Sequence, residues 1–313
     1  MHVPDGFLDL KTAAATAVLS GAALAVSLRR LNRSLPRKNV PLMGLAGAFV
    51  FAAQMVNFPV AGGTSGHLIG GVLVGVLLGP AAGVVVMSCV LIVQCLLFAD
   101  GGILSLGANI FNMGVISSAG GYALYRLISR VVRGDQGKYL GIVFASWCST
   151  VIAAVCCAGE LAWSGTVSWS AAFPAMANVH MLIAVGESLI TALVYSAIAA
   201  ARPDITSGGS PAAESGKDVL VYAGLIAAGI FLFISPFASK WPDGLESVAA
   251  KLGFGTASLA RPAISSPLQG YTIPGIGSAA AATVLAGLAG TCIVFAGGIV
   301  LARILARRGK HEA

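Results

Sequence analysis

The sequence predicts an all-α integral membrane protein that crosses the bilayer nine times. Only 10% of its 313 residues are charged, whereas soluble domains carry about 25% charged residues. Hydrophobic residues make up 57% of the chain, and the mean hydropathy is +0.88. The 40 glycines are typical of membrane helices, in which small residues let backbones approach each other closely.

Apolar stretches of about 17–25 residues are long enough to cross a hydrocarbon core about 30 Å thick. One stretch, 67–99, is too long for a single crossing, and Gly79-Pro80 divides it into two short helices joined by a tight turn. The polar segment 236–277 predicts a long loop. The nine expected spans are 10–29, 41–57, two within 67–99, 107–129, 139–162, 176–201, 219–235 and 280–302.

A polar segment divides these spans into a group of seven and a group of two. It contains SGGSPAAESGK, a composition typical of flexible linkers. The sequence therefore predicts two modules, residues 1–201 and 219–313, joined by a cytoplasmic linker at 202–218.

The basic residues predict the orientation, because cytoplasmic loops of membrane proteins carry an excess of Lys and Arg. Most of the 19 basic residues fall in loops or tails that nine crossings place on one side. We therefore expect an outside N-terminus, a cytoplasmic C-terminus and a multi-pass location in the cell inner (cytoplasmic) membrane. The net charge of +7 follows from this topology, so no nucleic-acid partner is expected. The opposite side would hold only Lys11, Lys240, Lys251 and Arg261.

The first two residues combine an α-amine with an imidazole. We expect no signal peptide, because Met1 is followed at once by His2 and Pro4, without a basic region or a cleavage site. The Met1 amine, the His2 amide nitrogen and the His2 imidazole would then close two fused chelate rings and supply three coplanar nitrogens. Pro4 has no N–H and offers no further amide nitrogen.

His67, within GGTSGHLIGG, is the predicted fourth ligand. It lies at the outer end of the third span, on the same side as the N-terminus. Four nitrogens in a square plane favour Ni(II) or Cu(II) over Co(II), and such ligands must be deprotonated to bind. The residues alone leave a second interpretation open, in which the Met-His start has no function and His67 is a loop histidine bonded to the backbone.

Four further polar residues lie in or beside the spans. His180 and Glu187 are spaced to face the same bundle interior, where a network between helices is the favoured role. Asp100 and Asn109 flank a glycine-rich outer loop, ADGGILSLGANIFNMG. We expect these two to cap helix ends or shape a pocket rather than to bind metal.

Four motifs occur in order over residues 1–201: MHVPDGFLD, GGTSGHLIGGVLVGVLLGP, VQCLLFADGGILSLGANIFNMG and GESLITAL. They resemble the CbiM/NikM family, the substrate-binding S components of energy-coupling-factor transporters for cobalt and nickel. The resemblance implies a seven-helix S-component bundle into which the N-terminal segment tucks. It also implies Ni(II), or alternatively Co(II), as the transported substrate. The implied ligands are the Met1 amine, the His2 amide nitrogen, the His2 imidazole and the His67 imidazole.

The C-terminal part contains WPDGLESVAAKLGF and LQGYTIPGIGSAAAATVLAGLAGT. It resembles the small two-span companion subunit of nickel-type systems (NikN-like), which would help to load metal or hold the N-terminal segment closed. The PDGLE motif, Pro242 to Glu246, favours nickel over cobalt. Asp243 and Glu246 are expected to form a capped turn, with cation gathering as the alternative role.

The chain has no GxxxxGK[ST] loop, so ATP hydrolysis must come from another subunit. The resemblance implies a transmembrane coupling (T) subunit and two ATP-binding cassette subunits as partners, besides membrane lipid. In the second span Gly44, Ala48 and Ala52 recur every four residues. Such a small-residue face suits either docking of the coupling subunit or packing within the bundle.

Two other classes of protein fit less well. A secondary transporter would show an inverted repeat and paired charges in mid-membrane, whereas only Glu160 and Glu187 lie near the spans. A membrane metalloenzyme needs a catalytic carboxylate beside its metal, and the chain has no HExxH pair. We therefore expect a transport subunit and not an enzyme, with cobalt uptake as the alternative to nickel uptake.

Overall fold

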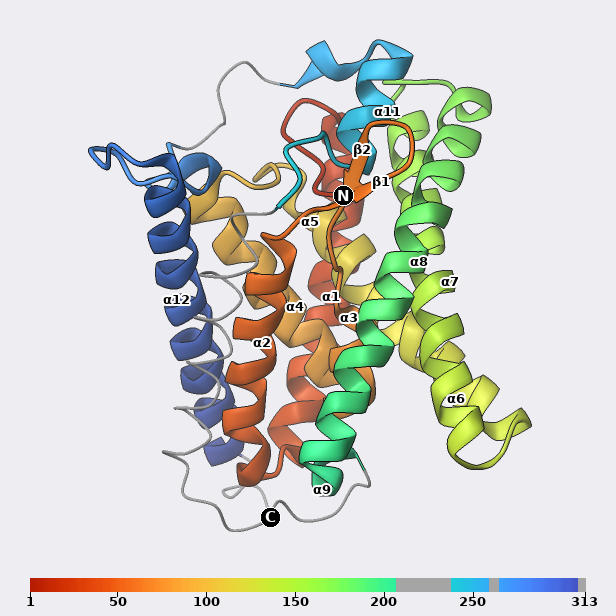
Figure 1. The fold of residues 1–313 in the computed structure, drawn as a ribbon, viewed down its shortest axis with the longest axis vertical. Coiled ribbons are helices and arrows are strands. Elements are labelled where there is room, and N and C mark those ends of the chain that lie inside the picture. Colours follow the sequence, from red (N-terminus) through yellow and green to blue (C-terminus); the bar gives the residue numbers. More distant parts are fainter. Residues whose placement is uncertain (207–237, 259–264, 309–313) are drawn as a thin grey trace.

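The computed structural model describes residues 1–206, 238–258 and 265–308. They form a helical bundle with a small two-stranded hairpin at one end (Figure 1). Five helices in this described part are long and apolar enough to cross a membrane. The predicted span at 219–235 lies outside the described residues. The helices that meet the length and hydropathy requirement are α1 (Leu10–Ser34), α4 with its π-helical end (Pro80–Phe98), α7 (Gly134–Trp163), α8 (Trp169–Ala201) and α12 (Ala279–Arg308).

The first two helices begin and end at recognisable sequence signals. Asp9 caps α1 by accepting the main-chain N–H of Thr12 at 2.9 Å. The helix ends just before Pro36, since the residue preceding a proline disfavours helical geometry. A short 3₁₀ turn (Arg37–Asn39) leads into α2 (Val40–Gln54), which has a proline in its first turn, where no helical hydrogen bond is lost.

The third span was predicted to begin at residue 67, but the segment 58–78 is helical only from Gly71. It forms a hairpin of β1 (Phe58–Val60) and β2 (Thr64–Gly66), then an extended stretch, and only then α3 (Gly71–Leu78). His67 therefore lies in extended chain and not at a helix end. With 8 residues, α3 is about 12 Å long and too short to cross a bilayer alone.

The predicted division at Gly79-Pro80 is confirmed. Gly79 has a φ of 88°, which is costly for other residues, and α4 (Pro80–Val93) begins at the proline. The helix ends in a π-helical turn, Gln94–Phe98. After a short loop, α5 (Leu106–Asn109), a π-helical segment (Ile110–Gly120) and α6 (Gly121–Val131) follow one another without a break.

Helices α7 and α8 pack along each other on the side of the bundle away from α12 (Figure 1). Helix α8 begins at Trp169, earlier than the predicted start at residue 176. His180 thus lies in the body of the helix. Both His180 and Glu187 are buried, with 2% and 1% of their surface exposed, so the expected interior location is confirmed.

Helix α12 packs against α2 (Figure 1). A Cβ placed on Gly44 would lie 2.7 Å from Ile299 Cγ1, and one on Gly298 would lie 3.0 Å from the Gly44 Cα. The small-residue face of the second span is therefore used within the chain, with Ala48 and Ala52 also buried. Of the two uses expected for this face, the structure supports packing within the bundle.

The remaining described elements lie in the predicted loop 236–277 or within the predicted linker 202–218. Helix α9 (Pro203–Thr206) follows α8. Helix α11 (Gly244–Leu252) lies above the hairpin, at the end of the bundle where the N-terminus is found (Figure 1). Two 3₁₀ turns, Gly255–Ala257 and Gln269–Tyr271, complete the loop.

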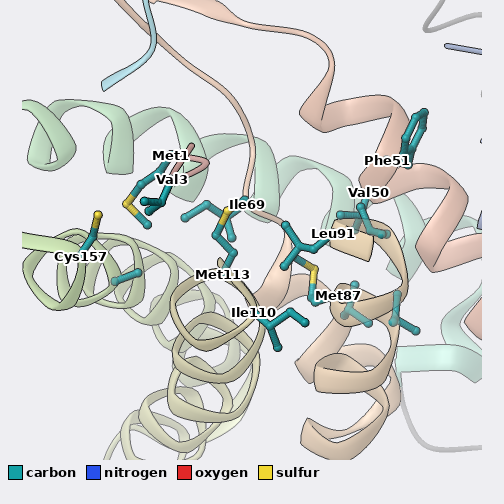
Figure 2. Close-up of a cluster of buried hydrophobic side chains, with 14 of the residues drawn as sticks. Met1, Val3, Val50, Phe51, Ile69, Met87, Leu91, Ile110, Met113 and Cys157 are labelled. Atoms are coloured by element: carbon teal, nitrogen blue, oxygen red, sulfur yellow. The ribbon is translucent and has the colours of Figure 1, made fainter. Parts of the chain in front are cut away.

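The core runs from the centre of the bundle to the N-terminus. Met1 and Val3 belong to the same buried cluster as Ile69, Met113 and Cys157 (Figure 2). Met1 is 4% exposed and Val3 is fully buried. The first residues of the chain are therefore part of the core, which is unusual because chain termini are generally loosely held.

Candidate metal centre

The N-terminal segment is held in the bundle by main-chain hydrogen bonds. The Val3 N–H donates to Asn109 Oδ1 at 2.7 Å, and Asn109 Nδ2 donates back to the Val3 carbonyl at 3.1 Å. The same carbonyl accepts the Gly102 N–H at 2.9 Å. Asp5 Oδ1 accepts the Leu104 N–H at 2.9 Å. Asn109 thus fixes Val3, and the N–H groups of Gly102 and Leu104 hold the segment against the 100–105 loop.

This anchoring depends on a close approach at Gly102. A Cβ there would overlap the main chain and carboxylate of Asp5. We expect Gly102→Ala to push the N-terminal segment outward, lower the free energy of unfolding by about 1–3 kcal/mol and reduce the retention of any metal held by this segment. Thermal unfolding in detergent and metal analysis would measure both effects. Gly277→Ala is the matched control, because a Cβ at Gly277 meets no atom within 4 Å; equal behaviour of the two variants would contradict the prediction.

The Met1 amine and His67 meet in the structure. The amine nitrogen lies 2.7 Å from His67 Nε2. Two nitrogens that occupy neighbouring corners of a square plane, each about 2.0–2.1 Å from the metal, lie about 2.8–3.0 Å apart. The observed separation is close to that required of neighbouring ligands, although the two residues are 66 positions apart.

The ring nitrogens that would face away from a metal are already hydrogen-bonded. His67 Nδ1 lies 3.1 Å from the Leu68 carbonyl, and His2 Nε2 lies 3.1 Å from Gln94 Oε1. The Leu68 carbonyl can only accept, so His67 Nδ1 donates and the lone pair is left on His67 Nε2. His2 has an acceptor at each ring nitrogen, Gln94 Oε1 at Nε2 and Asp100 Oδ1 at Nδ1, and the neutral ring donates to one of them. In the form that donates to Gln94, the lone pair is on His2 Nδ1. Metal-binding histidines are typically oriented by such a donated bond.

His2 Nδ1 faces a carboxylate in this structure. It lies 3.2 Å from Asp100 Oδ1, while the other oxygen of Asp100 accepts the Tyr271 hydroxyl. The His2 and His67 rings are stacked with centroids 5.2 Å apart and an interplanar angle of 29°. Metal binding by Nδ1 would replace the Asp100 contact. Asp100 therefore lies beside the predicted ligand His2 and is held by Tyr271.

Burial favours the neutral form of both imidazoles. It lowers the pKa of His2, against the opposing charge of Asp100. Burial lowers the pKa of His67 well below its ordinary value, and the Met1 ammonium lowers it further. Both rings stay neutral to more acidic pH than a free imidazole. Neither ring has to lose a proton near neutral pH before it binds a metal.

Asp243 also reaches this site, which the sequence did not predict. Its Oδ2 lies 2.9 Å from the Met1 amine, while its Oδ1 accepts the Glu246 N–H at 2.8 Å. Burial alone would raise the pKa of Asp243, but the Met1 ammonium and His67 outweigh burial and hold it below its ordinary value. Glu246 Oε2 accepts the Asp243 N–H at 3.0 Å, which completes a capping box. The expected capped turn is confirmed.

Glu187 fixes the chain next to His67. Its two carboxylate oxygens accept the N–H groups of Ile69 at 2.6 Å and Gly70 at 2.9 Å. His180 Nδ1 bonds the Met176 carbonyl at 2.8 Å within its own helix. In the described part of the chain no hydrogen bond or ion pair joins His180 to Glu187. Glu187 instead connects α8 to the backbone just before α3.

Within residues 1–206, 238–258 and 265–308, no three His, Cys, Asp or Glu side chains converge on a site that could hold a metal. The candidate ligands are two imidazoles and main-chain nitrogens. A site of this kind depends on the chain terminus as much as on side chains.

Comparison with known families decides the assignment. Residues 2–205 match the family described as the cobalt uptake substrate-specific transmembrane region, CbiM. The chain belongs to the CbiM family. Residues 217–307 of this CbiM-family protein match the PDGLE domain, which agrees with the resemblance to a NikM protein fused to a NikN-like module.

Two relatives match this CbiM-family protein over both the CbiM region and the PDGLE domain, and a third matches over about two thirds of the chain. A chain of Archaeoglobus fulgidus assigned as a fused nickel transport protein NikMN is 39% identical over 305 residues, covering 97% of this chain and 98% of the relative. The fused nickel transport protein NikMN of Rhodobacter capsulatus is 30% identical, covering 95% and 96%. The cobalt transport protein CbiM of Acetohalobium arabaticum is 31% identical over 63% of this chain and 80% of its own length.

A solved structure supports the bundle fold. A crystal structure of a truncated transition metal transporter superposes with a TM-score of 0.59 at 33% identity, covering 64% of this CbiM-family chain and 99% of the other. Together with the five apolar helices, these relatives establish a multi-pass membrane protein of the nickel and cobalt transport type.

Proposed function

We propose that this chain is the substrate-specific subunit of an ATP-driven nickel uptake transporter. It captures Ni(II) outside the cell through the Met1 amine, the His2 amide nitrogen, His2 Nδ1 and His67 Nε2. The chain itself does not hydrolyse ATP. A separate transmembrane coupling subunit and two ATP-binding cassette subunits supply the energy for uptake.

One observation carries this proposal: the 2.7 Å approach of the Met1 amine to His67 Nε2, with the outward nitrogens of both imidazoles already hydrogen-bonded. The remaining proposed ligand, the His2 amide nitrogen, is also available to bind metal. Among the described residues its N–H donates to no acceptor, whereas the neighbouring Val3 N–H donates to Asn109. An amide nitrogen that binds metal must lose its proton. The His2 amide can do so without breaking a hydrogen bond, whereas the Val3 amide would lose its bond to Asn109.

Two observations favour nickel over cobalt. Four nitrogens in a square plane suit Ni(II) better than Co(II). The relatives that match this chain over both parts are named as nickel transport proteins, whereas the relatives named as cobalt transport proteins match about two thirds of it. Cobalt uptake through the same site is the alternative.

The proposal places nine spans in the cell inner membrane, seven in an S component at residues 1–201 and two in a companion module at 219–313. The linker at 202–218 lies in the cytoplasm, and the end of the bundle that carries α11 faces outward. Metal binds beneath α11, the bundle tilts when the coupling subunit is driven by ATP, and the site opens to the cytoplasm.

The direct test is the metal content of protein purified from cells grown with nickel and cobalt together. We expect about one Ni(II) per chain and the absorption band of a diamagnetic square-planar complex. Retention of cobalt in preference would support the alternative substrate. Protein that retains neither metal, and cells whose uptake is unchanged by its removal, would contradict the proposed function.

A further inference from the structure

The PDGLE turn lies directly against the hairpin that precedes His67. The Ser65 N–H donates to the Pro242 carbonyl at 2.8 Å, and the Ser65 hydroxyl donates to the Trp241 carbonyl at 2.7 Å. Next to these, the Thr64 and Ser247 hydroxyls are hydrogen-bonded at 2.7 Å. Five hydrogen-bonding residues, two from the N-terminal part and three from the C-terminal part, therefore fix the turn at one position on β2.

The glycine of the motif allows this approach. A Cβ at Gly244 would lie 2.8 Å from His180 Cε1 and 2.8 Å from Ile183 Cδ1, so a larger residue would lift the turn away from α8. Leu245, the next residue, is fully buried. The motif is thus seated on both the hairpin and α8, and this seating brings Asp243 to the chain terminus.

Asp243 uses its two oxygens for different purposes. Oδ1 caps α11 through the Glu246 N–H, and Oδ2 contacts the Met1 amine. The cap needs only one oxygen, and Ser or Asn would serve as well at this position. The second oxygen is therefore the feature that capping does not explain. It lies in a largely buried setting, with side-chain exposures of 3% for Met1 and 14% for Asp243.

We propose that Asp243 is a positioning residue for metal capture: it accepts an N–H of the Met1 amine and so directs the amine nitrogen toward His67. This inference rests on the proposed function. An amine that binds a metal keeps N–H groups beside the lone pair that it donates. In this structure the protonated amine donates one N–H to Asp243 and another to His67 Nε2, 2.7 Å away. The fixed acceptor restricts rotation of the amine and keeps its nitrogen beside His67 Nε2, so that both nitrogens can turn to one metal once the amine has lost a proton.

This role connects the two modules. The C-terminal part then contributes no metal ligand but completes the geometry of the ligands in the N-terminal part. Partners that orient a metal ligand commonly change metal affinity by about 10–100-fold. We expect an effect in this range from loss of the Asp243 contact alone.

The test compares three variants of the full chain. Asp243→Ser and Asp243→Asn keep a good helix cap but offer the amine no second acceptor oxygen. Glu246→Ala removes the other half of the capping box and leaves the amine contact in place. Nickel affinity by competition with a chelator, the Ni(II) absorption band and the thermal midpoint of metal-free protein are measured for each.

We expect both Asp243 variants to bind Ni(II) about tenfold or more weakly, with a shifted band, and to have a lower thermal midpoint because the buried Met1 amine loses its partner. Glu246→Ala should bind nickel as the native protein does, with a lower midpoint. Native affinity in Asp243→Ser would overturn the inference, and so would an equal loss of affinity in Glu246→Ala. If the native protein binds nickel, either of these two results overturns only the role of Asp243 and leaves the proposed function intact. If the native protein binds no nickel, both the role of Asp243 and the proposed function are wrong.

Discussion

His67→Ala is expected to lower the affinity for Ni(II) by more than about a hundredfold, because even the partners that only orient a ligand are worth 10–100-fold. The substitution removes the one predicted ligand that comes from outside the first two residues. Its Nε2 lies 2.7 Å from the Met1 amine. The remaining three nitrogens would still close two chelate rings but would leave one corner of the square open. Metal content and competition with a chelator would measure the loss.

His180→Ala provides the matched control for this substitution. His180 is also a buried histidine, but its Nδ1 bonds the Met176 carbonyl in its own helix and it is not among the proposed ligands. We expect this variant to retain nickel with the native absorption band. If His67→Ala retained nickel as well as His180→Ala does, the proposed ligand set would be wrong.

An alanine inserted between Met1 and His2 should abolish uptake while nickel binding persists. The insertion moves the imidazole to the third position, where an amine, two amides and an imidazole supply four nitrogens without His67. The rest of the segment is held in register by Asn109, which bonds both the N–H and the carbonyl of Val3. The displaced amine therefore loses its contacts with His67 and Asp243.

The measurement combines cellular nickel uptake with metal analysis of the purified variant. Combining the insertion with His67→Ala should leave the metal content unchanged, because the new chelate does not use that residue. One alanine inserted in the glycine-rich stretch at 207–210 serves as the control and should preserve uptake. Normal uptake by the N-terminal insertion would show that the register of the first residues is irrelevant to transport.

The sequence predicted the features that depend on local pattern. Hydropathy located the long helices, Gly79-Pro80 located the break between α3 and α4, and the Asp243-to-Glu246 spacing predicted the cap of α11. Each of these follows from residues close together in the chain. The pairing of Met1 with His67 came instead from the predicted topology and from the family resemblance.

Other features depended on contacts that no local pattern reveals. Met1 and Asp243, which are in contact, are 242 positions apart in the sequence, and the contact of the PDGLE turn with Ser65 is equally non-local. The hairpin 58–66 carried no strand pattern long enough to recognise. The spacing of small residues on α2 was compatible with docking of a coupling subunit and with packing inside the bundle. The contact of α12 with this face supports packing inside the bundle.

The burial of Met1 beneath the PDGLE turn sets an order of events during synthesis. Asp243, which contacts the Met1 amine, follows Met1 by more than three quarters of the 313 residues, so the amine is made well before the residue that covers it. Enzymes that remove or add groups at the amine must therefore act before the C-terminal module docks. An amine still blocked at that moment would be excluded from its place beside His67. Maturation of the chain terminus and assembly of the metal site are in this sense one process.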